Sequence, residues 1–123
     1  MKRALVVDDS RVIRRMLSRI LAKQGYCVEE ATNGRDGLQL IKDRREIGLI
    51  CTDWNMPDMD GLEFLANVRA DSHVGIVPVL MITAETKIEC MVQAMEAGAS
   101  EYLMKPFDEE MVVDKLKMVD ALR

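Results

Sequence analysis

The sequence predicts an α/β protein in which helices cover both faces of a doubly wound, five-stranded parallel sheet. Apolar or β-branched runs alternate with helical patterns along the whole 123-residue chain, and such alternation is typical of parallel sheets joined by helices. A chain of this length buries about two-thirds of its unfolded surface as one domain. It contains no repeat, low-complexity segment or linker, so residues 1–123 are expected to form one domain without an output domain. The strand-like runs cover residues 3–8, 26–31, 48–53, 77–83 and 100–104.

The fourth run indicates that the sheet is parallel. Its residues Val77-Pro78-Val79-Leu80-Met81-Ile82 are apolar at nearly every position instead of alternating with polar ones. Both faces of this strand must therefore be covered, as in a parallel sheet between two helix layers. Right-handed crossovers then favour the strand order 2-1-3-4-5, whose switch point lies between the first and third strands.

Apolar residues that recur with a period near 3.6 predict a helix after each strand. Four of these stripes are well defined, whereas the fifth is less regular because it includes Lys115. In chain order the stripes are Val12, Ile13, Met16, Leu17, Ile20 and Leu21; Leu38, Leu40 and Ile41; Leu62, Phe64, Leu65 and Val68; Ile88, Met91, Val92 and Met95; and Met111, Val112, Lys115, Leu116 and Val119.

Capping signals mark several helix ends. Ser10 is suited to cap the first helix and Gly25 to close it, while Gly98 is suited to end the fourth. The segment Asp60-Gly61-Leu62-Glu63 resembles a capping box for the third helix, with Glu63 reaching back to the cap. Asp108-Glu109-Glu110 places acid in the first turn of the fifth helix, where the helix dipole favours it.

Composition and charge exclude several classes of protein. The net charge of −4 argues against sequence-independent binding of nucleic acid, although local basic patches remain compatible with it. No apolar run has the length of a membrane span, and Met1-Lys2-Arg3 leads directly into a strand instead of a signal peptide. A cytoplasmic protein with neither a membrane nor a nucleic-acid partner is expected.

Cysteine and histidine offer little chemistry. Cys27, Cys51 and Cys90 are odd in number and widely spaced, without the spacing of zinc or redox motifs. We interpret Cys27 and Cys51 as small buried hydrophobic residues within strands. His73 is the only histidine, so neither a catalytic triad nor a histidine metal cluster can form.

Polar residues follow the ends of four predicted strands. Asp8 and Asp9 end the first run and Asp53 ends the third. Thr83 ends the fourth run and Lys105 follows the fifth. The carboxyl ends of neighbouring strands form one crevice, where two carboxylates about 5 Å apart repel each other by roughly 3 kcal/mol. A cation is therefore expected, and oxygen-only ligands favour Mg²⁺.

A carboxylate, a hydroxyl and an ammonium group beside a hard cation suit phosphoryl transfer. Asp53 can act as the nucleophile and form an aspartyl phosphate. Mg²⁺ and Lys105 would neutralise charge on the phosphoryl oxygens, and Thr83 would donate a hydrogen bond to one of them.

These motifs resemble the receiver domain of bacterial two-component response regulators over essentially the whole chain. Within that family the chain is most similar to the single-domain regulators of chemotaxis, which have a flavodoxin-like fold and the strand order 2-1-3-4-5. The residues that carry the resemblance are Asp8-Asp9, Asp53-Trp54-Asn55-Met56-Pro57-Asp58-Met59-Asp60-Gly61, Thr83-Ala84 and Lys105-Pro106-Phe107.

The resemblance implies a role for each residue of the metal and phosphoryl site. Asp53 would be the phosphoacceptor. Asp9 and Asp53 would bind Mg²⁺ directly together with the backbone carbonyl of Asn55, while Asp8 would act largely through water. The Lys105–Pro106 bond would be cis, as it is in the family.

The resemblance also implies residues that respond to phosphorylation and residues that control its duration. Thr83 and Tyr102 would be the switch pair: Thr83 moves toward the phosphoryl group, and Tyr102 turns inward. Asn55 and Glu85 match the two positions that tune phosphoryl lifetime.

The partners and reaction follow from the same resemblance. A histidine kinase, for which a CheA-like kinase is one candidate, or a phosphotransfer domain would supply the phosphoryl group. A monomeric protein would then contact a downstream protein, with the flagellar motor switch as one candidate. It would not be an enzyme in the ordinary sense, but its own phosphorylation and dephosphorylation would be self-catalysed.

Three alternatives stay open. The chain could act in a phosphorelay or on a target other than the motor, and it could be the receiver part of a DNA-binding regulator. A Mg²⁺-dependent phosphohydrolase of the haloacid-dehalogenase type is less favoured, because such enzymes have an acid two residues after the nucleophile and position 55 is Asn.

Other polar and sulfur-containing residues have simpler interpretations. Asp58 and Asp60 are explained as a turn residue and a helix cap. Arg11, Arg15 and Arg19, with Arg14 beside them, form a stripe that is interpreted as a solvated face, with docking of a kinase as the alternative. Core packing is favoured over an adaptable partner surface for the methionines near the last two helices, which are Met91, Met95, Met104, Met111 and Met118.

Overall fold

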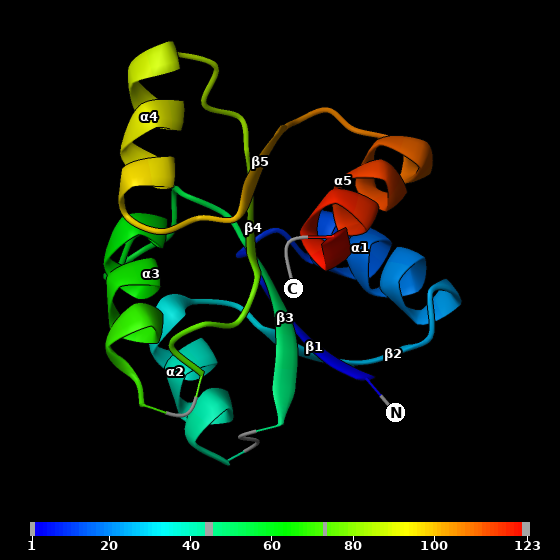
Figure 1. Cartoon of the computed structure of the whole chain (residues 1–123), viewed down its shortest axis with the longest axis horizontal. Coiled ribbons are helices and arrows are strands. Elements are labelled where there is room, and N and C mark those ends of the chain that lie inside the picture. The colour runs from blue at the N-terminus through cyan, green and yellow to red at the C-terminus, as the bar shows by residue number, and fades with distance from the viewer. Residues whose placement is uncertain (1, 44–45, 73, 122–123) are drawn as a thin grey trace.

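The computed structural model describes residues 2–43, 46–72 and 74–121, and it confirms the expected alternation of strands and helices (Figure 1). His73 lies outside these described residues. In chain order the elements are β1 (Lys2–Val7), α1 (Arg11–Lys23), β2 (Tyr26–Ala31), α2 (Gly34–Asp43), β3 (Ile47–Thr52), α3 (Gly61–Ala70), β4 (Val79–Thr83), α4 (Ile88–Glu96), β5 (Glu101–Met104) and α5 (Glu109–Ala121).

The predicted sheet topology is confirmed. The strands lie in the order β2-β1-β3-β4-β5, and every neighbouring pair is parallel. Helices α1 and α5 cover one face of the sheet, and α2, α3 and α4 cover the other (Figure 1). The described helices include none that is long and apolar enough to cross a membrane.

Successive strand residues contribute to opposite cores. In β1, Leu5 and Val7 belong to the core under α2, α3 and α4, whereas Ala4 and Val6 belong to the core under α1 and α5. All four side chains have no exposed surface. Because side chains alternate across a strand, a sheet covered on both faces needs an apolar residue at every position. The continuous apolar runs of the sequence are thus a direct result of the two helix layers.

The predicted helix caps are confirmed in most respects. The Ser10 hydroxyl accepts a hydrogen bond of 3.3 Å from the Ile13 N–H. Gly25 and Gly98 follow α1 and α4 with φ of 95° and 109°, a conformation that glycine adopts without strain. The Asp60 carboxylate accepts from the Glu63 N–H at 2.9 Å, but among the described residues Glu63 returns no bond to the cap. Only half of the predicted capping box therefore forms.

The fourth strand begins later than predicted. The run 77–83 was expected to be extended throughout, yet β4 starts at Val79. The Val77 N–H closes a turn onto the Val74 carbonyl at 3.0 Å. Pro78 has no N–H for the sheet, although its carbonyl accepts the Ile50 N–H at 3.0 Å. The remaining strand boundaries agree with prediction to within one residue.

Two helical stripes do not face the core as expected. In α1, Val12 is 72% exposed, and the buried residues are Leu17, Ile20 and Leu21. In α4 the small residue Ala94 is the buried one, while Ile88, Val92 and Met95 are 73%, 45% and 42% exposed. The apolar period was thus read correctly, but in α4 much of the stripe faces away from the sheet.

Candidate functional site

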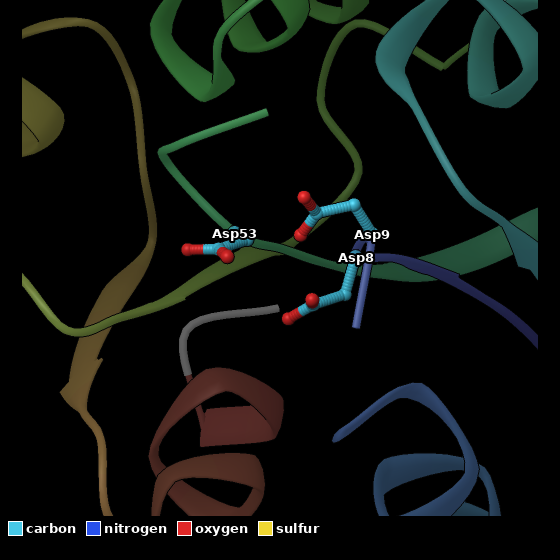
Figure 2. Close-up of side chains that lie close together, drawn as sticks. All are labelled: Asp8, Asp9 and Asp53. Carbon is cyan, nitrogen blue, oxygen red and sulfur yellow. The ribbon is translucent and has the colours of Figure 1, made fainter. Parts of the chain in front are cut away.

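Three carboxylates meet at the carboxyl ends of the adjacent strands β1 and β3, as predicted (Figure 2). Asp8 and Asp9 follow β1, and Asp53 follows β3. These strands are hydrogen-bonded neighbours, with Val7 opposite Thr52. One carboxylate oxygen from each of the three acids lies within 4.8 Å of the others. The order of the strands therefore creates the acidic cluster from residues that are far apart in the chain.

Asp8 is the most deeply buried member of the cluster, with 1% of its surface exposed against 7% for Asp53. Its carboxylate accepts a hydrogen bond of 2.8 Å from the Ser10 N–H, and its backbone N–H donates to the Ala31 carbonyl at 3.1 Å. Burial raises the pKa of the Asp8 carboxyl, and repulsion from Asp53 adds to this effect. The hydrogen bonds from Ser10 and Lys105 lower the pKa without offsetting the rise. Ionising Asp8 therefore costs more free energy than ionising an exposed carboxyl.

Asp53 is held by the loop that it starts. Its backbone N–H donates to the Val7 carbonyl at 3.0 Å, and one carboxylate oxygen accepts from the Trp54 N–H at 2.7 Å. Farther along, the Gly61 N–H donates to the Trp54 carbonyl at 2.7 Å. A Cβ at Gly61 would collide with the backbone of Asp53 and Trp54, so only glycine permits this close approach.

Lys105 joins the two inner carboxylates. Its Nζ lies 3.0 Å from Asp8 Oδ2 and 3.0 Å from Asp53 Oδ2. Burial lowers the pKa of the Lys105 ammonium, but the hydrogen bonds and attraction of both carboxylates outweigh it, and the net pKa is raised. The peptide bond from Lys105 to Pro106 is cis, as the resemblance implied. Lys105 therefore reaches the site as predicted and remains charged there.

The cluster fits a hard divalent cation. Three carboxylates and one ammonium group leave a net charge of about −2 at the site, which costs several kcal/mol of repulsion if uncompensated. The donor atoms are all carboxylate oxygens, the kind that Mg²⁺ prefers, and Asp9 is exposed so that water can complete the coordination. Asp8, Asp9 and Asp53 are thus the residues that could hold Mg²⁺.

The predicted switch and tuning residues converge on Glu85. The Glu85 N–H donates to the Thr83 hydroxyl at 3.3 Å, and the Tyr102 hydroxyl donates to the Glu85 carbonyl at 2.9 Å. The Glu85 side chain accepts a hydrogen bond of 3.1 Å from the Asn55 amide. Thr83 is fully buried and Tyr102 is 6% exposed. The segment after β4 therefore links the threonine, the tyrosine and the loop after Asp53.

Tyr102 adopts an inward position in this structure. Burial raises the pKa of its hydroxyl, with smaller contributions from Cys90, Glu85 and Asp53. The phenol therefore stays protonated and acts as a hydrogen-bond donor.

Asp58 and Asp60 serve the roles expected of a turn residue and a cap. Asp58 has φ of 69° and lies inside a turn closed by the Met59 N–H on the Pro57 carbonyl at 2.7 Å. Asp60 caps α3 through the Glu63 N–H. Neither residue belongs to the carboxylate cluster among the described residues.

Arg14 is a contact of the site that the sequence did not reveal. The sequence predicted that Arg14 lies on a solvated face together with Arg11, Arg15 and Arg19, which is wrong for Arg14, because its side chain is only 11% exposed. Its Nη1 donates to the Asp8 carbonyl at 2.9 Å, and its Nε donates to Glu30 Oε1 at 3.0 Å. Spacing alone could have placed Arg14 nearer the sheet than Arg11 and Arg15, but not on a backbone carbonyl.

Comparison with known proteins gives consistent results. Residues 4–117 match the family model of the response regulator receiver domain. The chain is 39% identical to chemotaxis protein CheY-3 of Vibrio cholerae over 116 residues, which cover 94% of this chain and 88% of the relative. It is 37% identical to chemotaxis protein CheY1 of Helicobacter pylori, with 94% of each chain covered. The solved structure of chemotaxis response regulator CheY4 of Vibrio cholerae superposes with a TM-score of 0.90 at 40% identity, covering 97% of this chain and 98% of that one.

Proposed function

The chain belongs to the response regulator receiver domain family, and from this membership we propose that it is a phosphorylation-driven signalling switch. Residues 1–123 act as one receiver domain, and Asp53 is the phosphoacceptor. The observation that carries the proposal is the convergence of Asp8, Asp9 and Asp53, with Lys105 bridging Asp8 and Asp53. The pattern of a nucleophilic carboxylate beside a cation site and an ammonium group suits phosphoryl transfer.

In the proposed site Asp9 and Asp53 would hold Mg²⁺ directly together with the backbone carbonyl of Asn55, and Asp8 would act largely through water. When bound, Mg²⁺ supplies positive charge that stabilises the developing charge on the phosphoryl oxygens. The carboxylate cluster and the exposure of Asp9 support this assignment.

The chain's own residues carry the transfer step. A carboxylate oxygen of Asp53 forms a bond to phosphorus while the bond from phosphorus to the donor's imidazole nitrogen breaks. The Lys105 ammonium and the Thr83 hydroxyl stabilise the phosphoryl oxygens. To end the signal, water attacks the phosphorus and the bond from phosphorus to the Asp53 oxygen breaks. Phosphate leaves and the Asp53 carboxylate is regenerated. Both steps are self-catalysed, and the protein acts as a signalling phosphoacceptor, not as an enzyme with a separate substrate.

The segment around Glu85 is proposed to transmit the change. Thr83 and Tyr102 form the switch pair, and both are hydrogen-bonded to the peptide groups of Glu85. When Thr83 turns toward the phosphoryl group, its bond to the Glu85 N–H is exchanged for one to phosphate. Asn55 and Glu85, which are hydrogen-bonded to each other, tune how long the phosphoryl group survives.

The partners are proposed from the family and from the names of the relatives. Those relatives are chemotaxis proteins, and we therefore place this cytoplasmic protein in chemotaxis, with a CheA-like histidine kinase or a phosphotransfer domain as donor. The monomer then binds a downstream protein, for which the flagellar motor switch is the leading candidate. A phosphorelay or a target other than the motor is the alternative.

Exposed apolar residues on α4, β5 and α5 support signalling through protein contact. Core packing was expected for five methionines of this region, but only Met91 packs against a core. The other four are 37% to 48% exposed, and flexible methionines suit adaptable binding surfaces. The exposed apolar residues of this surface are Ile88, Val92, Met95, Met104, Met111 and Met118.

Trp54 provides a test of the proposed function. It is partly buried beside Asp53 and donates its backbone N–H to that carboxylate. Mg²⁺ should therefore change its fluorescence, and beryllofluoride, an analogue of a phosphoryl group, should change it further. The response to beryllofluoride should be absent in Asp53→Asn.

Asp58→Asn is the matched control, because it makes the same chemical change five residues away and outside the cluster. Asparagine also tolerates the positive φ of that position. Asp58→Asn should respond as the wild type does. An Asp53→Asn protein that still responds to beryllofluoride like the wild type would remove Asp53 as the acceptor.

A further inference from the structure

The Asp9 carboxylate receives no fixed support from other side chains. Within the described parts of the chain, no hydrogen bond or ion pair reaches this exposed carboxylate. Asp8 and Asp53, by contrast, are held by Ser10, Trp54 and Lys105. The direction of the Asp9 side chain therefore depends on the backbone that carries it, and first of all on the Asp8–Asp9 peptide group.

Arg14 holds that peptide group from the α1 side. Its Nη1 donates a hydrogen bond of 2.9 Å to the Asp8 carbonyl, which is the oxygen of the Asp8–Asp9 peptide. The guanidinium is in turn oriented by Glu30, whose Oε1 accepts from Nε at 3.0 Å. The carbonyl of Ala31, the next residue on β2, accepts a hydrogen bond of 3.1 Å from the Asp8 N–H. Both sides of the Asp8 backbone are thus tied to the end of β2, one directly and one through Arg14.

From this arrangement we propose that Arg14, oriented by Glu30, is a positioning residue for the Mg²⁺ site. It fixes the Asp8–Asp9 peptide plane and so directs the Asp9 carboxylate toward Asp53. The inference rests on the proposed Mg²⁺ site. Groups that orient metal ligands from outside the coordination sphere commonly affect metal affinity by about tenfold or more.

Charge and position predict opposite effects at Arg14. A cation near a Mg²⁺ site repels the metal, so simple removal of its charge should tighten Mg²⁺ binding. Loss of a positioning contact should weaken it. Arg14→Met keeps the apolar stem but removes the charge and the hydrogen bonds. Arg14→Lys keeps the charge but loses the planar guanidinium, which donates to two acceptors at once.

The test measures the Mg²⁺ dissociation constant of the full chain from Trp54 fluorescence, in buffer of moderate ionic strength. Arg14→Met and Arg14→Lys should both raise it by about fivefold to tenfold, near the lower end of such effects. Glu30→Gln should also raise the Mg²⁺ dissociation constant, but by less in the Arg14→Met background than in the wild type, because Glu30 acts through Arg14. At saturating Mg²⁺, phosphorylation of Asp53 by acetyl phosphate should return close to the wild-type rate.

Arg15→Met is the matched control. Arg15 also contacts Glu30, at 3.4 Å, but its side chain is 57% exposed and makes no bond to the Asp8 carbonyl. Its replacement should leave the dissociation constant unchanged or slightly lower. Unfolding in urea with a chelator present checks that each variant is folded before Mg²⁺ is added.

The outcomes separate the two proposals. An Arg14→Lys protein that binds Mg²⁺ like the wild type, or an Arg14→Met protein that binds it more tightly, would overturn the positioning role alone. A wild-type protein whose Trp54 does not respond to Mg²⁺ would overturn the Mg²⁺ site as well.

Discussion

At the scale of single residues, the site brings together carboxylates that repel one another. Asp8 is buried beside Asp53, and its raised pKa means that its ionised form costs folding free energy. A carboxyl whose pKa is higher in the folded than in the unfolded state binds more protons when folded. Stability therefore falls as the pH rises from the ordinary value of 3.8 through the folded-state pKa.

Asp8→Asn tests this opposition. Without Mg²⁺ the variant should have a higher free energy of unfolding than the wild type near about pH 7, with the difference shrinking toward about pH 4. With Mg²⁺ the order should reverse, because a ligand at 100 times its dissociation constant stabilises the wild type by about 2.7 kcal/mol. Urea unfolding across this pH range, with and without Mg²⁺, measures both effects.

Asp58→Asn again serves as the control, since it also replaces a carboxylate but lies outside the cluster. It should show neither the gain without Mg²⁺ nor the reversal with it. An Asp8→Asn protein that is less stable than the wild type in the absence of Mg²⁺ at neutral pH would show that the Lys105 contact outweighs burial at Asp8.

The site residues that follow strand ends could be predicted from the sequence, whereas the individual side-chain contacts could not. Asp8 and Asp53 could be assigned because β1 and β3 are adjacent and their carboxyl ends meet, and Lys105 because β5 ends at the same edge of the parallel sheet. The contact of Arg14 with the Asp8 carbonyl and that of Tyr102 with the Glu85 carbonyl depend on rotamers and loop paths. No spacing in the sequence encodes those.

At the scale of elements, the end of the sheet opposite the site is fastened by Arg69 at the end of α3. Its guanidinium donates to the Gly98 carbonyl after α4 from Nε at 3.0 Å and from Nη2 at 2.6 Å. Nη1 donates to the carbonyls of Gly75 and Val77 in the segment before β4. Burial lowers the pKa of Arg69. This one side chain therefore ties α3, the approach to β4 and the end of α4 together.

Arg69→Met should lower the free energy of unfolding by about 2 kcal/mol, because hydrogen bonds from a charged group are lost and partly buried carbonyls are left without their side-chain donor. Arg19→Met, on the exposed side of α1, should change it by less than about 0.5 kcal/mol. Urea denaturation of both variants measures the difference. Equal stability of the two variants would mean that water replaces the Arg69 contacts without cost.

Helical periodicity predicted the elements better than their orientation. The stripe Ile88, Met91, Val92 and Met95 marked α4 correctly, yet the residue that packs fully against the sheet is Ala94. A helix that lies close to a sheet can have a small residue at the contact. A 3.6-residue period does not show whether an apolar helix face packs against the sheet or is exposed to a partner protein.

At the scale of the whole molecule, the carboxylate cluster and the exposed apolar residues lie at different places on the fold. The carboxylates lie at the ends of β1 and β3, whereas the exposed methionines lie on α4, β5 and α5. Glu85 and Tyr102 connect the two regions through one hydrogen bond. A switch with separate input and output surfaces is consistent with membership of the receiver family.

The layered architecture was predictable because a strand covered by helices on both faces is apolar at successive positions. Val79 to Ile82 are buried without alternation, which requires cover on both faces. The start of β4 was not predictable from hydrophobicity, because Val77 is also buried but lies in a turn.

The most direct test of the central proposal is to locate the phosphoryl group chemically. The protein is treated with acetyl phosphate, with and without Mg²⁺, the acyl phosphate is reduced with borohydride, and the modified residue is identified by peptide mass spectrometry. We expect modification at Asp53 that depends on Mg²⁺ and disappears in Asp53→Asn. Modification of the wild type at a different residue, or none at Asp53 in the presence of Mg²⁺, would contradict the assignment.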